Sequence, residues 1–431
     1  MNLKSIKLPE TVTRNKVVIE RVLIAIAFAA CFVGCWKKQV DRHPVAYKPP
    51  KPVLSKNVRV LLYDNVDHVT ISSGGGFNVN DSLMILKGQF GDKSGNVDVT
   101  VDSGLIMIGD RKFGNGSVIT PEASSLLNVN GNLYRGKIKL LTSDNGKTFR
   151  IINEVAMPEY LLGVVGAEMP SYWQPEALKA QTVAARTYCL YTKKRFGINR
   201  PWDVRRTQAN QVYLGVSAET PTVRQAVEST RGLVLACRHR DGTTGIFPTY
   251  YSSTCGGHTE SSYNVFGEYF PPLTGVKCDH CKKTAPKKYM SWGPLDFDKT
   301  EITARLIAQY PVLASLKAVK SIEPARVSDY GNGKRITSFR IIGENGKDGY
   351  LKAEDLRLTL DSTGTILKST FCKVKNAKDK IRFDDGRGFG HGVGLCQYGV
   401  QALARQGKTY DEILSHYYPT AMISRLNHER F

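Results

Sequence analysis

Residues 157–188 read MPEYLLGVVGAEMPSYWQPEALKAQTVAARTY, and this stretch contains two helical patterns separated by a short break. A proline near the start of each pattern, Pro158 and Pro175, suits the first turn of a helix. The first helix is expected to end near Gly166, and the second to run from Pro175 to about Lys194. The second helix has a face of small side chains, which lets another backbone pack closely against it: Ala177, Ala180 and Ala184, with Tyr188.

The segment before this pair of helices, residues 57–150, has the pattern of strands. Residues 97–101 alternate apolar and polar side chains with a period of two, as a half-buried strand does. Asn145-Gly146 suits a tight hairpin turn between two further strands. We therefore expect a small antiparallel, β-rich region at this end of the folded chain.

The segment from residue 151 to 425 mixes helices and strands in an irregular order. We expect a further helix near residues 300–310, and a glycine-dense turn at 386–394 that leads into another helix. The capping box Thr409-x-x-Glu412 opens a last helix. Because there is no regular βαβ period and no internal repeat, the predicted fold class is α+β, with a mixed α/β core that contains a cleft.

The N-terminus has the features of an export signal or a membrane anchor. Residues 22–36 carry no charge and follow a basic segment, which is typical of a secretory signal or a signal anchor. Phe32-Val33-Gly34-Cys35 resembles the box at which bacterial lipoproteins are cut and lipidated on cysteine, so lipidation and an uncleaved anchor both stay open. We assign residues 1–36 to the signal or anchor and 37–56 to a Pro/Lys-rich linker. The folded part is expected outside the cytoplasm, attached to the membrane or released after cleavage.

The composition limits the class of protein and of partner. The chain of 431 residues has 60 Lys and Arg against 39 Asp and Glu, a net charge of +21. With 41% hydrophobic residues, it is not a largely disordered chain. A negative mean hydropathy and a single long apolar run exclude a polytopic membrane protein. The basic excess favours a polyanion: nucleic acid, an anionic membrane face or a carboxylate-rich polymer. Nucleic acid is the weakest of these, because the chain is expected to be exported and no groove-reading module is present.

Glu168 is the best candidate for a catalytic acid. It falls between the two predicted helices, where Pro170 disfavours helical geometry in the preceding residue. Apolar and aromatic neighbours such as Trp173 raise the pKa of a carboxyl group, which suits a general acid near neutral pH. The alternative is a glutamate that only offsets the positive end of the next helix. The rival carboxylate, Glu176, is explained by a structural pair with Lys179.

Three blocks of sequence carry a family resemblance. EYLLGVV, EMP and EALKAQTVAARTY lie within residues 159–188, SSTCGGHTE occupies 252–260, and GFGHGVGLCQYGV occupies 388–400. In this order they resemble the stage II sporulation protein D family, which includes the amidase-enhancer proteins. The resemblance reaches from about residue 57 to the C-terminus, and its main departure is Cys396, where serine is expected.

The resemblance implies a lytic transglycosylase of peptidoglycan with Glu168 as the catalytic glutamate. In that chemistry one carboxyl group protonates the oxygen between N-acetylmuramic acid and N-acetylglucosamine. It then takes the proton of the muramic acid C6 hydroxyl, which closes a 1,6-anhydro ring, so no second carboxylate is needed to activate water. The alternative is a non-catalytic, glycan-binding enhancer of a cell-wall amidase. Either protein would act in cell-wall remodelling, of which sporulation is one setting.

The family blocks imply further substrate-binding positions, each with a structural alternative. Lys179 and Arg186 share a helix face and suit substrate carboxylates, although a solvated basic face explains them too. His391 lies in a glycine-flanked loop where a ligand can approach the backbone. A nucleophilic pairing of His391 with Cys396 is disfavoured, because the family has no required thiol there. The full set is Lys179, Arg186, Tyr188, Ser252, Ser253, His391 and Gln397.

The spacing of cysteine and histidine residues predicts a metal site. Cys255-x-x-His258 and Cys278-x-x-Cys281 have the spacing of paired ligands, and four such ligands complete a tetrahedral structural zinc site. Disulfide bonds are the competing interpretation, since the expected compartment is oxidising. No organic cofactor is expected.

Overall fold

Helices and strands are interleaved in the part of the chain that the computed structural model describes, residues 57–84, 95–122, 125–331 and 333–426. All described residues belong to one compact unit, Leu54–Phe431. The predicted signal or anchor and the linker up to residue 56 lie outside the described residues. Within the described part, no helix is both long enough and apolar enough to cross a bilayer.

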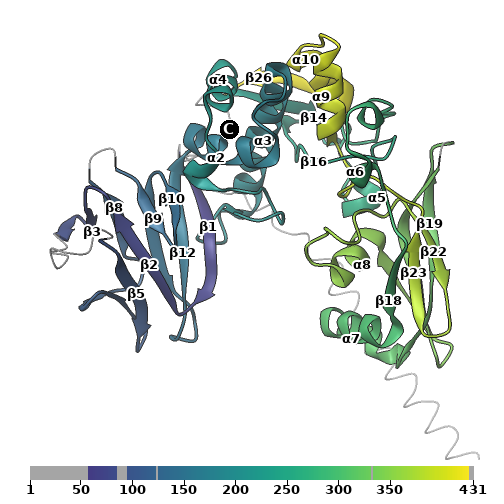
Figure 1. Ribbon diagram of the computed structural model, residues 1–431, viewed down its shortest axis with the longest axis horizontal. Coiled ribbons are helices and arrows are strands. Elements are labelled where there is room, and N and C mark those ends of the chain that lie inside the picture. The colour runs from purple at the N-terminus through teal and green to yellow at the C-terminus, as the bar shows by residue number, and fades with distance from the viewer. Residues whose placement is uncertain (1–56, 85–94, 123–124, 332, 427–431) are drawn as a thin grey trace, which may run out of the picture. The chain divides into compact units, whose positions relative to one another are not determined.

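The strands that precede the first long helix form two sheets, one of which also includes β13 (Val204–Arg205) from later in the chain (Figure 1). One has the order β13-β1-β12-β11-β8-β3-β4, and the other has the order β10-β9-β2-β5-β6-β7. Buried side chains of both sheets, such as Val60 and Ile71, belong to one hydrophobic core. The first sheet consists of β1 (Asn57–Val66), β3 (Phe77–Val79), β4 (Ser82–Met84), β8 (Val118–Pro121), β11 (Lys137–Thr142), β12 (Phe149–Ala156) and β13 (Val204–Arg205). The second consists of β2 (His68–Ser73), β5 (Val97–Asp102), β6 (Leu105–Ile108), β7 (Arg111–Phe113), β9 (Leu127–Val129) and β10 (Asn132–Tyr134).

These sheets confirm the predicted strands and modify the predicted turn. β5 covers the strand predicted at residues 97–101. β11 and β12 pair antiparallel as expected, but a longer loop, residues 143–148, connects them. Asn145 accepts hydrogen bonds through Oδ1 from the backbone N–H groups of Lys147 and Thr148, so it stabilises this loop and not a two-residue turn.

The two helices of the opening stretch are α2 (Met157–Glu168) and α3 (Pro175–Phe196). Both begin with proline in the first turn, as predicted. α2 does not stop at Gly166, because this glycine is a packing position: a Cβ there would lie 1.9 Å from the carbonyl oxygen of Ala218. α3 buries its small face, Ala177, Ala180 and Ala184. It packs against α2, α4 (Pro221–Ser229), α9 (Gln397–Arg405), α10 (Tyr410–Tyr417) and β14 (Leu233–Arg238).

The rest of this core surrounds α3. β14 (Leu233–Arg238) lies between β15 (Thr244–Ile246) and β26 (Met422–Arg425), and the short strands β16 (Tyr251–Ser252) and β25 (Leu395–Cys396) pair in parallel. The predicted capping box of Thr409 and Glu412 is present at the start of α10. The remaining elements are η1 (Gly215–Ala218), α4 (Pro221–Ser229), α5 (Ser262–Phe266), η2 (Cys281–Lys283), α9 (Gln397–Arg405) and α10 (Tyr410–Tyr417).

A segment inserted between the second and third family blocks has a hydrophobic core of its own. Side chains such as Ile322, Phe339 and Phe383 are buried together there, and the helix predicted near residues 300–310 is present as α7. The segment contains α6 (Lys287–Met290), β17 (Ser291–Trp292), β18 (Leu295–Asp298), α7 (Lys299–Gln309), η3 (Pro311–Leu316), β19 (Val319–Asp329), β20 (Lys334–Gly343), β21 (Asp348–Lys352), α8 (Ala353–Leu360), β22 (Lys373–Asn376), β23 (Lys380–Asp384) and β24 (Gly386–Arg387). The described residues therefore have the mixed α/β architecture expected from the sequence.

Candidate active site

Glu168 is the last residue of α2. The sequence predicts it in the loop between the two helices, and that prediction is wrong. The next residue, Met169, leaves the helix with φ −134° and ψ 141°, an extended conformation that the following Pro170 favours. The N–H of Met169 still donates to Val165 O at 3.0 Å and closes the last turn. The carboxyl group is thus attached to a rigid helix end.

Three neutral donors from separate segments hold the Glu168 carboxyl group. The backbone N–H of Val212 donates to Oε1 at 2.9 Å, and Gln397 Nε2 donates to Oε2 at 3.3 Å. The Tyr251 hydroxyl also donates a hydrogen bond to the carboxyl group. In the described part of the chain these partners are an amide N–H, a side-chain amide and a hydroxyl, so the site is built around one carboxyl group and not an acid pair.

Burial raises the pKa of the Glu168 carboxyl group above its usual value. The hydrogen bonds from Val212, Gln397 and Tyr251 stabilise the ionised form and act in the opposite direction, but burial is the larger effect. A carboxyl group with a raised pKa keeps its proton to higher pH, which is what a general acid near neutral pH requires.

A chain of hydrogen bonds behind Glu168 holds the Tyr251 hydroxyl in place. Tyr160 OH donates to Gln211 Oε1 at 2.9 Å, and Gln211 Nε2 donates to Tyr251 OH at 2.9 Å. Gln211 is fully buried, and its Nε2 also donates to the carbonyl of Ala185. Sequence reasoning missed Tyr251, Gln211 and Val212. The only signal was that Tyr251 directly precedes the second family block.

The second and third family blocks lie side by side. Ser252 in β16 is paired with Cys396 in β25, and the carbonyl of Ser253 accepts a hydrogen bond from the backbone N–H of Tyr398 at 3.1 Å. Because β16 and β25 run parallel, Tyr251 of β16 and Gln397, which directly follows β25, both reach Glu168. Of the predicted substrate-binding residues, Gln397 therefore contacts Glu168 directly. Ser252 lies on β16, and Ser253 directly follows it.

Lys179 and Arg186 lie on α3, and each is bound to another residue of the protein. Lys179 Nζ lies 2.6 Å from Glu176 Oε1, and the other oxygen of Glu176 accepts from the backbone N–H of Tyr410. Arg186 is 3% exposed and donates to the carbonyl of Leu233 at 2.9 Å. Burial lowers the pKa of Arg186 to about 10. Lys179 is therefore paired within α3, whereas Arg186 joins α3 to β14.

Tyr188 and His391 are held by packing. Tyr188 accepts a hydrogen bond from Asn210 Nδ2 at 3.3 Å. The His391 ring lies edge-on to Tyr250 and Phe266, with centroids 5.9 and 5.3 Å away, and its Nδ1 accepts from Val393 N. Burial lowers the pKa of His391 to about 4, so the ring is neutral near pH 7.

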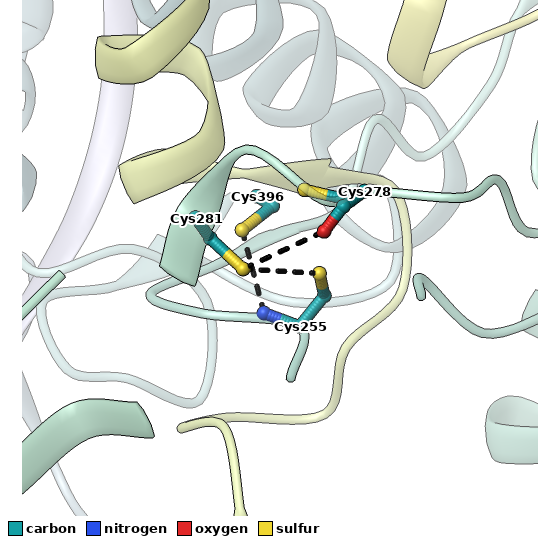
Figure 2. Close-up of side chains that lie close together, drawn as sticks. All are labelled: Cys255, Cys278, Cys281 and Cys396. Atoms are coloured by element: carbon teal, nitrogen blue, oxygen red, sulfur yellow. Dashed lines mark hydrogen bonds between the residues drawn. The ribbon is translucent and has the colours of Figure 1, made fainter. Parts of the chain in front are cut away.

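Four cysteine side chains lie close together near β16 and β25 (Figure 2). The sulfur atoms of Cys255, Cys278, Cys281 and Cys396 all lie within 4.8 Å of one another, and all four side chains are buried. His258, predicted as a ligand, lies outside this group. Its ring is stacked on Tyr330 with centroids 3.9 Å apart, and its Nδ1 is 2.6 Å from the carbonyl of Thr259. The structure thus brings three of the four predicted ligands together and adds Cys396, the departure from the family pattern.

Comparison with known proteins identifies the family. Residues 145–236 match the family model described as Stage II sporulation protein. The chain is 31% identical over 287 residues to Stage II sporulation protein D of Bacillus subtilis, which covers 63% of this chain and 76% of that protein. It is 31% identical over 341 residues to an uncharacterized protein of Brachyspira hyodysenteriae, covering 79% of this chain and 81% of the relative. Identity to the Amidase enhancer of Bacillus subtilis is also 31%, over 75% of this chain but only 49% of that protein. The chain belongs to the stage II sporulation protein D family.

Proposed function

We propose that the protein is a peptidoglycan lytic transglycosylase in which Glu168 is the single catalytic carboxyl group. The observation that carries this proposal is the environment of Glu168: one carboxyl group with a raised pKa, held by neutral donors at the end of a helix. A paired-carboxylate hydrolase needs a second acid to activate water or attack the sugar. A transglycosylase needs only one group that gives and then recovers a proton.

The reaction balances on Glu168 alone. The protonated carboxyl group gives its proton to the oxygen between N-acetylmuramic acid and N-acetylglucosamine, and the bond from the muramic acid C1 to that oxygen breaks. The C6 hydroxyl oxygen of the same muramic acid then bonds to C1, and its proton passes to the Glu168 carboxylate. The products are a 1,6-anhydro-muramic acid end and a free glucosamine end, with no water consumed and the carboxyl group protonated again.

The three donors have a defined part in this cycle. After the first transfer Glu168 is ionised in a partly buried site, where an unpaired charge would be costly. Val212 N–H, Gln397 and Tyr251 stabilise this carboxylate and fix its orientation toward the sugar. Burial therefore favours a protonated carboxyl group before the reaction, and the three donors stabilise the carboxylate that forms after the first proton transfer.

Other features agree with a glycan substrate in the cell wall. The net charge of +21 suits a polymer that carries lactyl and peptide carboxylates. Tyr172, four residues after Glu168, is 81% exposed and offers an aromatic face for a sugar ring. Residues 1–36 would export the chain and attach it to the membrane, either by an uncleaved anchor or by a lipid on Cys35. Membrane fractionation of the wild type and of Cys35→Ser tests this attachment.

The second candidate function is a non-catalytic amidase enhancer that binds glycan strands and recruits a cell-wall amidase. It is favoured by one observation: the relative named Amidase enhancer aligns with 75% of this chain. The two functions share the substrate and differ only in whether the glycan is cut.

An assay of the product separates them. Purified protein is incubated with glycan strands stripped of their stem peptides, and mass spectrometry measures 1,6-anhydro ends. We expect these ends with the wild type and with Glu176→Gln, a glutamate of the neighbouring helix that is paired with Lys179. We expect none with Glu168→Gln. If the wild type yields no anhydro ends while it and Glu168→Gln sediment with glycan equally, the enhancer function replaces the enzymatic one.

A further inference from the structure

Three separate segments contribute the four clustered cysteines. Cys255 follows β16, and Cys396 ends β25. Cys281 begins η2, and Cys278 lies three residues before it. We propose that these four thiolates bind one zinc ion in a closed, tetrahedral, structural site. The ligand set differs from the one that spacing predicts, since Cys396 takes the place of His258.

The distances fit a metal site better than a disulfide bond. Cys281 Sγ points toward Cys255 Sγ at 3.7 Å (Figure 2). Zinc–sulfur bonds of about 2.3 Å at tetrahedral angles place two sulfur atoms about 3.8 Å apart. A disulfide bond needs about 2.0 Å. With all four sulfur atoms within 4.8 Å of one another, one ion at their centre reaches each of them after small movements.

Donors around the cluster are directed at sulfur. The backbone N–H of Cys255 donates to Cys396 Sγ at 3.3 Å, and the hydroxyl of Tyr417 lies 3.1 Å from Cys278 Sγ. A backbone N–H can only donate, so Cys396 accepts at this contact. Hydrogen bonds to ligating sulfur spread the negative charge of a metal-bound thiolate and fix its orientation.

A buried arginine beside the cluster has an incomplete set of partners. Arg335 is 1% exposed, and its Nη2 donates to the carbonyl of Cys255 at 2.5 Å. Its Nε and Nη1 have no hydrogen-bond partner among the described residues. The carboxylate that interacts with it electrostatically, Glu354, is itself paired with Arg357. Binding of Zn²⁺ releases the four thiol protons to solvent and leaves a centre of net charge −2. That charge would offset the cost of burying the Arg335 cation.

The site would support the candidate catalytic residue indirectly. Tyr251 lies four residues before Cys255, and Gln397 directly follows Cys396. Both contact Glu168, Tyr251 from β16 and Gln397 from the position directly after β25. An ion bound to Cys255 and Cys396 would cross-link the ends of these strands. Because all four positions are taken by protein sulfur, no coordination position is left for substrate, so the ion is structural.

The experiment measures metal on the purified full-length protein by elemental analysis and by Co²⁺ substitution. We expect about one zinc per chain, and in the cobalt form the visible absorption of a tetrahedral tetrathiolate site. Cys396→Ser should lose most of the zinc and this absorption. His258→Ala should keep both, as should Cys372→Ser, which removes a buried thiol outside the cluster.

Several results would overturn the proposal. These are a disulfide between any two of the four cysteines in non-reduced peptide maps, full zinc content in Cys396→Ser, or loss of zinc in His258→Ala. Iron in place of zinc would overturn the choice of metal. If Cys396→Ser does not fold, the wild type decides: a mercurial reagent should release one zinc as four thiols react, and no release would contradict the site.

Discussion

Gln397 donates a hydrogen bond from its Nε2 to Glu168 Oε2 at 3.3 Å, although the two residues are 229 positions apart in the chain. Glu168 ends α2, and Gln397 begins α9. This bond joins the first and the last of the three family blocks. The carboxyl group is therefore positioned by the tertiary structure and not by its own helix alone.

Replacing Glu168 by glutamine should stabilise the protein at neutral pH relative to the wild type. Burial raises the folded-state pKa of Glu168 above its ordinary value of 4.5. The unfolded chain therefore releases this proton first, and wild-type stability falls as pH rises from about 4.5 to the folded pKa. Glutamine has no proton to release. Thermal unfolding of both proteins from pH 4 to 8 measures the difference, which should grow with pH, and a constant difference would contradict a raised pKa.

Activity should depend on the titration of Glu168, and removing this carboxyl group should lower activity strongly. With Glu168→Gln the rate should fall by at least about 10²-fold, as expected when a general acid is removed. For the wild type, the rate should decline as pH rises through the pKa of Glu168. Tyr251→Phe removes a donor to the carboxylate, so this decline should move to higher pH by about one unit. Tyr418→Phe, which removes a hydroxyl bonded to the carbonyl of Tyr250, is the matched control and should not move it.

Gly166→Ala should affect both stability and activity. The added Cβ would lie 1.9 Å from the carbonyl oxygen of Ala218, so the end of α2 must shift. Overpacking of this kind costs about 1–3 kcal/mol, which chemical denaturation measures. Because Glu168 is two residues further along, turnover should also fall. Gly114→Ala is the control, since no heavy atom lies within 4 Å of its added Cβ. Unchanged stability in Gly166→Ala would contradict the close packing described.

His391 should make the protein sensitive to acid. Its folded pKa is lowered to about 4 by burial, from an ordinary value of 6.5. The unfolded chain binds this proton at higher pH, so wild-type stability falls as pH drops from 6.5 to about 4, by at most about 3 kcal/mol. His391→Gln should not show this loss of stability at low pH, and its side chain keeps an acceptor for Val393 N. Unfolding of both proteins between pH 4 and 7.5 tests it, and parallel curves would contradict the burial of the ring.

The local features of the fold could be predicted from the sequence. α2 and α3 begin where Pro158 and Pro175 predict, and the capping box at Thr409 opens α10. The end of α2 could not be predicted, because Gly166 is there to accommodate Ala218 and not to end the helix. A glycine that permits a tertiary contact looks the same in sequence as one that ends a helix.

The sequence predicts only those parts of the candidate site that depend on neighbouring residues in the chain. Glu168 was found from its neighbours, but its partners Val212 and Tyr251 come from distant segments with no pattern of their own. The metal ligands show the same limit. Spacing favours His258, whereas stacking on Tyr330, from the connection between β19 and β20, directs its ring elsewhere.

The parallel pairing of β16 with β25 also has a consequence for biosynthesis. A ribosome makes Glu168 early, but it must extend the chain through the whole inserted segment before Cys396 and Gln397 emerge. A product that terminates prematurely would contain the acid without the amide that orients it and without the fourth thiol. Completion of the site is thereby coupled to synthesis of the chain beyond the inserted segment.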